Sequence, residues 1–289
     1  MTDGIEPGLH WTDHFVKYGF AVVRGLVDRE FCEAALREVE RLVGNGVPVQ
    51  EWTTENTPVL HRPFYEGSTP PQPVLDRLFD QPRLLAAIDE LYGGPGRWNG
   101  QRNYYLFLKP YNPKGQARLS PRGHIDFGSQ TVPSLYRGFT FQLALIDTEP
   151  FSGNITLYPG THKVVQKALM DNPELQFPGG GSDLPMSEPF EFVARAGDVV
   201  FMHHLIFHSG NESHSANRVS RIGLHGEAFR DEWLIEIDPS RPDLSPWERS
   251  LALNGAFVEF PKAKEFQTQK RTEYLEKLKT PEGATDDRY

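Results

Sequence analysis

The chain is short of cysteine, of long apolar runs and of basic charge, and each shortage excludes a class of protein. Its only cysteine is Cys32, so neither an internal disulfide nor a cysteine-based zinc or iron–sulfur cage can form. No segment approaches the roughly 20 consecutive apolar residues of a membrane span. The N-terminal residues lack a basic segment followed by an apolar one, the pattern of a secretory signal. We therefore expect an unsecreted, cytoplasmic protein without a membrane partner.

The charge and the composition exclude further classes of protein. The formal net charge is −9, whereas sequence-independent binding to nucleic acid requires clustered Lys and Arg, so we expect no nucleic-acid partner. Hydrophobic residues make up 38% of the 289 residues and aromatic residues 12%, which is enough for a sizeable core. The 24 prolines and 26 glycines are typical of proteins whose many short strands need turns. One large domain is the expected organisation.

Helical periodicity dominates the first hundred residues. After a strand-like run at 19–24, apolar residues recur at helical spacing over 31–42, 74–79 and 82–92. Asp28 stands where a helix N-cap belongs. This part of the chain is therefore expected to be mostly helical.

Beyond residue 100 the pattern changes to short β-type runs separated by glycine and proline. The runs occupy residues 103–108, 139–146, 155–158, 190–193, 198–202 and 221–229. Several short strands at this spacing predict a barrel or a sandwich. The other expected elements are a helix near 162–170, a long loop over 172–189 and a helix in the charged tail at 261–279.

His124 and Asp126 form the first motif that carries chemistry. In an extended segment, residues two apart point to the same side of the chain, so one metal ion can bind both side chains. A site of two histidines and one carboxylate leaves three coordination positions open, enough for a bidentate 2-oxo acid and O2. An isolated His-x-Asp is weak support, because a solvated loop histidine beside a capping aspartate is a commoner origin of this pattern.

A second motif strengthens the metal interpretation. Gly197 and Asp198 form a natural turn before an apolar strand, and this strand carries histidines toward one end of a barrel. His208 is placed to supply the second histidine ligand. An arginine further along the chain can bind a carboxylate of 2-oxoglutarate through its planar, permanently charged guanidinium.

Three separated motifs resemble the phytanoyl-CoA dioxygenase-like family of Fe(II)/2-oxoglutarate oxygenases. They are His124-Ile125-Asp126, the segment 152–163, which is similar to the family's N-G-x-L-x-x-x-P-G-[ST]-H-K signature, and the segment 197–211. The resemblance covers roughly residues 101–229. The run GFAVVRGLVD near the N-terminus is similar to the family's opening strand.

The resemblance implies a mainly β fold with flanking helices around a double-stranded β-helix, the jelly-roll or cupin-like core. We expect a single oxygenase domain over 1–289, with a helical part at about 1–100, the core at about 101–230 and a C-terminal extension at about 231–289. The resemblance also implies Fe(II) bound by His124, Asp126 and His208 at the mouth of the barrel, with 2-oxoglutarate and O2 as cosubstrates.

An arginine for the far carboxylate of 2-oxoglutarate is implied as well, and two are available. Arg221 lies 13 residues after His208 and Arg218 lies 10 after it, and the family's spacing falls between the two. Arg221 is favoured because an apolar strand resumes directly after it. The further residues that the resemblance assigns to the cosubstrate pocket are Gln142 and, as weaker candidates, Tyr105 and Thr156.

Some neighbouring residues have alternative interpretations. His203 and His204 compete with His208, but either would leave too long a gap to the arginines, so we expect them to line the barrel or to support a ligand. Lys109 and the arginines that precede His124 could meet an anionic group of the substrate, although solvated loop charges explain them equally well.

Asp126 bears on the type of reaction, because related halogenases replace that carboxylate with Gly or Ala so that halide can bind iron. We therefore predict a dioxygenase that hydroxylates an unactivated C–H of a small organic substrate, lipid-like or from secondary metabolism, and releases succinate and CO2. The alternatives are desaturation, cyclisation or epimerisation at the same site, a non-catalytic metal-binding barrel, and a cupin-type enzyme that does not use 2-oxoglutarate. No motif specifies an oligomeric state.

The ligand assignment generates a direct prediction. Replacing His124, Asp126 or His208 by Ala, one at a time, is expected to abolish Fe(II) binding and 2-oxoglutarate turnover, because each change removes one of only three protein ligands. Metal content and succinate release measure the two effects. Full turnover in any one of the three variants would contradict the assignment.

Overall fold

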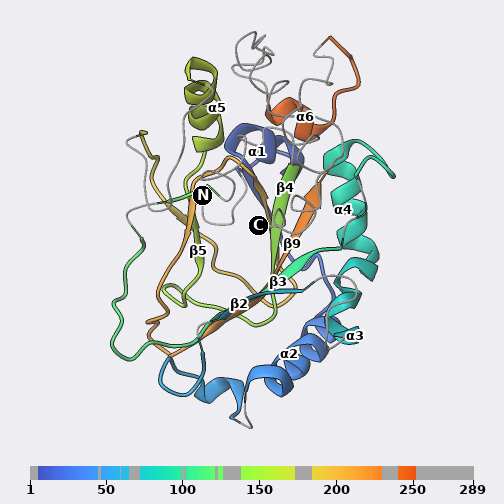
Figure 1. The fold of residues 1–289 in the computed structure, drawn as a ribbon. Coiled ribbons are helices and arrows are strands. Elements are labelled where there is room, and N and C mark those ends of the chain that lie inside the picture. Colours follow the sequence, from blue (N-terminus) through green and yellow to red (C-terminus); the bar gives the residue numbers. More distant parts are fainter. Residues whose placement is uncertain are drawn as a thin grey trace, which may run out of the picture.

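Two antiparallel sheets form the centre of the molecule (Figure 1). The computed structural model describes residues 6–44, 47–58, 60–64, 72–98, 100, 102–120, 123–125, 138–172, 184–229 and 240–251. The larger sheet has six strands in the order β1 (Phe20–Val23), β7 (Val199–His203), β4 (Gly138–Ala144), β9 (Arg221–Phe229), β3 (Tyr104–Lys109) and β2 (Leu60–Phe64). Its central strands β4 and β9 pair from Gly138↔Phe229 to Ala144↔Gly223.

The smaller sheet faces the larger one. Its strands are β6 (Phe190–Glu191), β5 (Ile155–Leu157) and β8 (His208–Gly210), in that order. An isolated antiparallel bridge between His124 and His208 adds the segment around residue 124 beside β8. Two facing antiparallel sheets are the arrangement of a jelly roll, so the predicted double-stranded β-helix core is confirmed.

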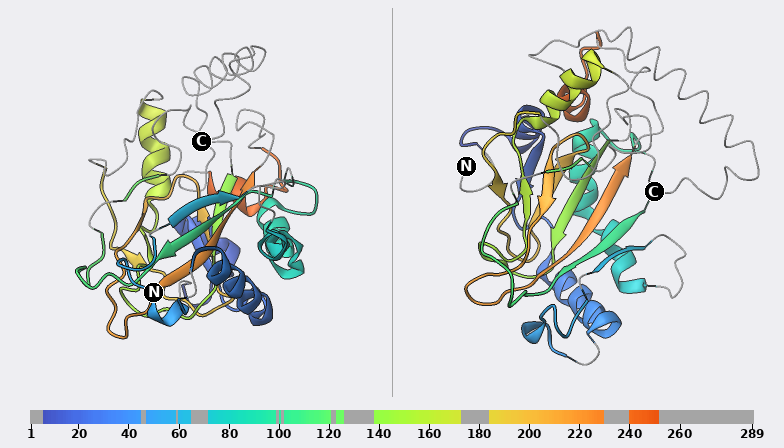
Figure 2. Two further views of the ribbon diagram at one scale, coloured as in Figure 1. Left: turned by 60° about the horizontal axis from the view of Figure 1, so that its bottom comes forward. Right: turned by 60° about the vertical axis from the view of Figure 1, so that its left-hand side comes forward.

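Helices lie on the outer face of the larger sheet and at one end of the barrel (Figure 2). They are α1 (Trp11–Tyr18), α2 (Arg29–Val43), α3 (Pro73–Asp76), α4 (Pro82–Tyr92), α5 (Thr161–Asp171) and α6 (Pro246–Ser250), with the 3-10 turns η1 (Val49–Glu51) and η2 (Arg77–Asp80). The predicted helices near 31–42, 82–92 and 162–170 are confirmed as α2, α4 and α5. Asp28 occupies the N-cap position of α2 without a side-chain cap bond.

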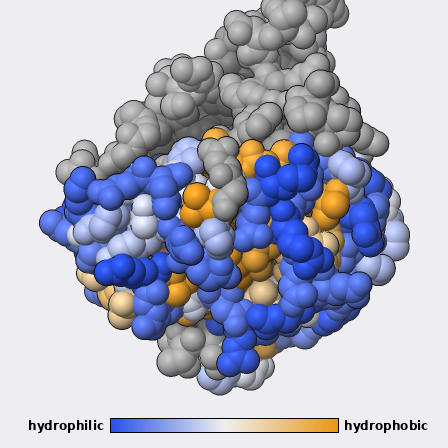
Figure 3. Space-filling model, turned by 90° about the horizontal axis from the view of Figure 1, so that it is seen from below, coloured by the Kyte–Doolittle hydropathy of each residue, from blue (hydrophilic) through white to orange (hydrophobic). Residues whose placement is uncertain are grey.

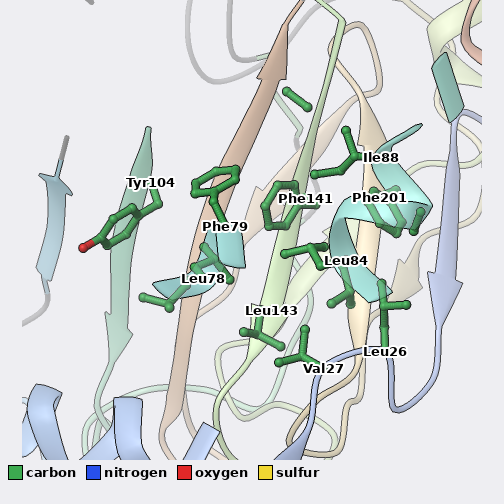
Figure 4. Close-up of a cluster of buried hydrophobic side chains, with 14 of the residues drawn as sticks. Leu26, Val27, Leu78, Phe79, Leu84, Ile88, Tyr104, Phe141, Leu143 and Phe201 are labelled. Carbon is green, nitrogen blue, oxygen red and sulfur yellow. The ribbon is translucent and has the colours of Figure 1, made fainter. Parts of the chain in front are cut away.

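Strand alternation separates two apolar layers. Odd-numbered residues of β4, such as Phe141 and Leu143, face outward and pack under the helices, where Phe79 meets Phe141 edge to face (Figure 4). Even-numbered residues of β7, Val200 and Met202, face inward and meet Leu157 of the smaller sheet. Because the period is two, the side chains that line the barrel interior are decided by strand register alone.

The larger sheet takes strands from the N-terminal part of the chain as well as from the core. β1 was expected from its apolar run, and it pairs with β7 from Phe20↔Met202 to Val23↔Val199. β2 lies in a polar, proline-containing stretch that gave no strand signal. Its position at the edge of the sheet explains this, because an edge strand tolerates a proline such as Pro63.

The predicted Gly-Asp turn before β7 is confirmed and has a specific role. Gly197 has φ +92°, and a Cβ there would lie 2.3 Å from the carbonyl oxygen of Val27. The Asp198 carboxylate accepts hydrogen bonds from the backbone N–H of Arg195 and Gly25 and from the Arg24 guanidinium. The turn therefore joins β7 to the loop that follows β1.

A group of buried histidines lies beneath α1 at the end of the barrel. The rings of His162 and His203 are 5.1 Å apart, and those of His203 and His204 are 4.5 Å apart. Desolvation, reinforced by Lys163, lowers the pKa of His162 to about 3. Desolvation also lowers the pKa of His203 well below its usual value, with neighbouring His204 adding to the effect. Both histidines are therefore neutral in the folded protein near pH 7.

No helix within the described ranges is long and apolar enough to cross a membrane. Seen from the end that carries α2, the surface is mostly hydrophilic, with a few hydrophobic residues showing between the polar ones (Figure 3).

The buried histidines predict that the folded state loses stability in acid. The unfolded state binds more protons than the native state once the pH falls below about 6.5. The free energy of unfolding should then decrease by up to about 1.4 kcal/mol per pH unit for each histidine that stays neutral in the fold. Urea unfolding of the metal-free protein at pH 7, 6 and 5 measures this.

A His203→Phe variant, which keeps an aromatic ring under α1, should show a shallower pH dependence between pH 7 and pH 5. An equal slope in the variant and in the unaltered protein would refute the contribution of His203.

Candidate active site

The structure brings His124 and His208 together, although they lie far apart in the sequence. Their backbones form a reciprocal pair of hydrogen bonds, with His124 N–H to His208 O at 2.8 Å and His208 N–H to His124 O at 2.9 Å. Their rings are 4.5 Å apart between centroids and inclined at 49°. Residues directly opposite in an antiparallel pair point to the same face of the sheet, so both imidazoles can bind one ion.

His208 presents a defined nitrogen to such an ion. Its Nδ1 lies 3.1 Å from the carbonyl oxygen of Ile206. A carbonyl oxygen only accepts, so Nδ1 carries the proton and Nε2 is the acceptor nitrogen of the ring. Metal-binding histidines commonly donate their second N–H to a backbone carbonyl in this way, which fixes the ring orientation. In this tautomer, Nε2 is the nitrogen through which His208 could bind an ion.

The third predicted ligand, Asp126, lies outside the described residues. Among the residues that the structure describes, no group of three His, Cys, Asp or Glu side chains could hold a metal ion. The described part of the chain therefore provides the histidine pair, and the carboxylate of Asp126 follows His124 by two residues. The donor set of two imidazoles and one carboxylate fits Fe(II).

Amide side chains hold the segment that leads to His124. Asn211, just after β8, donates to the carbonyl oxygen of Asn154 and to the hydroxyl of Thr156, both at 2.6 Å. Its Oδ1 accepts from the backbone N–H of Ser120 at 2.7 Å. The Tyr158 hydroxyl donates to the carbonyl oxygen of the same serine. β5, β8 and the approach to His124 are therefore tied together near the histidine pair.

Arg221 begins β9 and its guanidinium is buried inside the barrel. Nη1 donates to the carbonyl oxygen of Gly153 at 3.1 Å, and Nη2 donates to Oε1 of Gln142. Both acceptors are neutral, and no carboxylate among the described residues forms an ion pair with Arg221. Burial lowers the pKa of Arg221 to about 10, so it remains a cation at neutral pH. A buried cation with only neutral partners fits a binding site for a carboxylate.

Lys109 lies beside Arg221 and reinforces the positive charge. The two residues are paired across β3 and β9. The Lys109 chain passes close to Gly153 and Gly210, so it reaches from the larger sheet to the smaller one. Burial, and then the charge of Arg221, lowers the pKa of Lys109, while Glu212 opposes the shift. Two cationic side chains therefore lie next to each other where β3 and β9 pair.

Polar side chains of β3, β4 and β9 gather beside Arg221. Gln142 and Tyr105, both predicted for the cosubstrate pocket, face inward on β4 and β3. His225 joins them: its Nδ1 lies 3.2 Å from Nε2 of Gln142, and its ring meets those of Tyr105 and Phe107. His225 is not among the residues predicted for the pocket, yet its position four residues after Arg221 on β9 places both side chains on the same face of the strand.

Two other predicted residues lie elsewhere. The hydroxyl of Thr156 accepts a hydrogen bond from Asn211. Thr156 pairs with Ser209, next to the inward-facing pair Leu157 and His208, so its side chain points to the opposite face of the sheet. Arg218 is exposed in the turn before β9, where it has φ +59° and its guanidinium lies over the ring of Tyr111. The structure therefore does not bring Thr156 or Arg218 to the barrel interior.

The competing histidines are also separated from the histidine pair. His203 ends β7 and its Nδ1 accepts from the backbone N–H of Leu205. Nδ1 of His204 lies 2.6 Å from the carbonyl oxygen of Gly138. Both belong to the buried group beneath α1, so His208 is the histidine that stands opposite His124.

Fold and site together define a class: a double-stranded β-helix with an inward-facing histidine pair at one level of the barrel and a buried arginine at another. The sequence matches the family described as phytanoyl-CoA dioxygenase (PhyH) over residues 15–223. The chain belongs to the phytanoyl-CoA dioxygenase family, whose enzymes use Fe(II), 2-oxoglutarate and O2. It is accordingly a non-haem iron, 2-oxoglutarate-dependent enzyme.

Solved structures with a similar fold include enzymes of this kind. The non-heme α-ketoglutarate-dependent carbocyclase SnoK from nogalamycin biosynthesis is 18% identical, with a TM-score of 0.53 over 87% of this chain and 94% of its own. The epimerase SnoN, solved with Fe3+, α-ketoglutarate and nogalamycin RO, is 17% identical, with a TM-score of 0.50 over 86% and 91%.

The non-heme monooxygenase ThoJ is 16% identical, with a TM-score of 0.53 over 92% of this chain and 94% of its own. At these identities the similarity establishes the fold. No curated protein sequence matches the chain.

The two arginines can be distinguished by substitution. Arg221→Gln removes the buried charge, and the loss of a charge-assisted contact worth about 2–3 kcal/mol should raise the KM for 2-oxoglutarate roughly 30- to 100-fold. Arg218→Gln is the matched control and should leave this KM unchanged, because the Arg218 side chain is exposed. Succinate release at varied 2-oxoglutarate concentration measures both. The reverse ranking would assign the anchor to Arg218.

Proposed function

We propose that the protein hydroxylates an unactivated C–H bond of a small organic molecule, with His124, Asp126 and His208 binding Fe(II) and Arg221 binding 2-oxoglutarate. The observation that carries this proposal is the combination of the His124–His208 ring pair with a buried Arg221 that has only neutral partners among the described residues. A structural histidine pair would not require a cation deeper in the same barrel. A scaffold protein would have no reason to keep that cation buried.

The residues around Arg221 suit the far carboxylate of 2-oxoglutarate. Arg221 supplies a planar donor pair and Lys109 adds a second positive charge beside it. Gln142 and Tyr105 line the wall along which the rest of the cosubstrate would extend toward the histidine pair. The role of these residues is to bind and orient the cosubstrate and to keep bulk water from it.

Fe(II), when bound, would supply the redox chemistry: 2-oxoglutarate and O2 would be converted to succinate and CO2, with one oxygen atom of O2 entering succinate and the other inserted into the C–H bond of the substrate as hydroxyl. The Asp126 carboxylate supports hydroxylation over halogenation, because halide needs the position that a carboxylate occupies. The protein's own task is to place the target carbon near His124 and His208 and to exclude competing reactants.

Epimerisation and cyclisation are the second candidate, favoured by one finding. The epimerase SnoN and the carbocyclase SnoK share the fold at TM-scores of 0.50 and 0.53. A site that hydroxylates and one that epimerises differ in where the substrate is held, since both begin by removing a hydrogen atom. The substrate is therefore expected to be a small molecule of secondary metabolism or a lipid-like compound.

The experiment is a turnover assay with Fe(II), 2-oxoglutarate and O2 and a pool of small metabolites. Hydroxylation predicts a product heavier by one oxygen atom, formed together with succinate. Cyclisation or desaturation predicts a product lighter by two hydrogens, and epimerisation an isomer of unchanged mass.

Asp126→Ala, which removes a proposed ligand, is the matched control and should give neither succinate nor product. If the unaltered protein with Fe(II) releases no succinate, with or without substrate, the non-catalytic barrel is the better description.

A further inference from the structure

His225 is a buried side chain of the barrel interior to which no role has so far been assigned. It lies on β9 four residues after Arg221, and only 6% of it is exposed. Nδ1 lies 3.2 Å from Nε2 of Gln142. Its ring packs edge-on against Tyr105, with centroids 5.9 Å apart, and against Phe107 at 5.4 Å. Both packing and hydrogen bonding therefore hold the imidazole in one place.

The direction of the hydrogen bonds in this group follows from the donor inventory. A guanidinium only donates, so the atom of Gln142 that meets Nη2 of Arg221 must be its carbonyl Oε1. The amide nitrogen of the same side chain then points to His225. Nε2 of Gln142 only donates, so Nδ1 of His225 must accept. The hydrogen bonds from Arg221 to Gln142 and from Gln142 to His225 thus run in one direction. They require the His225 tautomer that carries its proton on Nε2.

Arg221 and His225 together favour one of the two orientations of the Gln142 amide. If the amide turned over, its NH2 group would face the guanidinium, donor against donor, and its oxygen would face His225. With the acceptor nitrogen of His225 in place, the observed orientation makes two hydrogen bonds, and Oε1 stays directed at Arg221. The guanidinium also donates to the carbonyl oxygen of Gly153 and lies over the ring of Phe107, so Gln142 is one of the groups that fix its plane.

We propose that His225 is a positioning residue for the carboxylate end of 2-oxoglutarate: through Gln142 it holds the Arg221 guanidinium in the plane that meets the carboxylate. This inference rests on the proposed function. A planar donor pair gains affinity when it is held in place before the ligand arrives, because less freedom is lost on binding. His225 itself needs no contact with iron, cosubstrate or substrate to act in this way.

Two substitutions separate hydrogen bonding from packing. His225→Phe keeps a ring against Tyr105 and Phe107 but removes the acceptor. His225→Asn loses the ring yet places an oxygen near the position of Nδ1, so it can still accept from Gln142. His214→Phe is the matched control, because His214 stacks on Tyr111 outside the barrel.

The measurement is the affinity of the full-length Fe(II) protein for 2-oxoglutarate, by anaerobic titration, together with KM and kcat for succinate release. In His225→Phe we expect the dissociation constant and KM for 2-oxoglutarate to rise about tenfold, with Fe(II) affinity unchanged and kcat within about twofold. His225→Asn should lie within about threefold of the unaltered protein. In a Gln142→Leu background, His225→Phe should cause no further loss, because the group through which it acts is already gone.

Unchanged 2-oxoglutarate affinity in His225→Phe would overturn the positioning role, as would a loss in His225→Asn equal to that in His225→Phe. An equal loss in His214→Phe would do the same, since the effect would then not be specific to the barrel. These results differ from a failure of the proposed function, in which the unaltered Fe(II) protein itself would not bind 2-oxoglutarate.

Discussion

The burial of a cation inside the barrel is the constraint on which the candidate site depends. Transfer of a guanidinium from water into a protein interior costs several kcal/mol unless the charge is compensated. Here Arg221 meets one amide oxygen and one backbone carbonyl, and its neighbour across the sheet is another cation, Lys109. Neutral dipoles offset part of that cost, and an anionic ligand would offset the remainder. The desolvation cost of Arg221 that the protein leaves uncompensated would thus be offset by a bound dicarboxylate.

The rest of the site is arranged around this cation by short polar side chains. Asn211 ties β5, β8 and the approach to His124 together through three hydrogen bonds. Asn154 donates to the carbonyl oxygen of Glu149 and to the carboxylate of Glu191, and so holds the turn before β5. Asp198 does the same for the turn before β7. Most of these hydrogen bonds are made to backbone groups, which would otherwise be buried without partners, so they hold in place the strands that carry the candidate site.

A site of this kind is suited to more than one outcome. In the proposed function the barrel binds Fe(II) and 2-oxoglutarate, and the placement of the substrate decides which reaction follows. Similar folds carry out epimerisation in SnoN and carbocyclisation in SnoK, while sharing less than a fifth of their residues with this chain. One fold can therefore host different reactions, and the reaction has to be argued from the residues of the site.

Sequence by itself determined the class of fold and the motifs. Strand periodicity located β1, β3, β4, β5, β7 and β9, helical periodicity located α2, α4 and α5, and His-x-Asp with the Gly-Asp strand indicated an iron site. β2 was not predicted from the sequence, because an edge strand that contains a proline has no distinctive residue pattern. The partnership of His124 with His208, the burial of Arg221 in preference to Arg218, and the place of His225 beside Gln142 were decided only by the tertiary structure. The reason is physical: each depends on the register between strands distant in the sequence, and a shift of one residue would turn every one of these side chains to the opposite face.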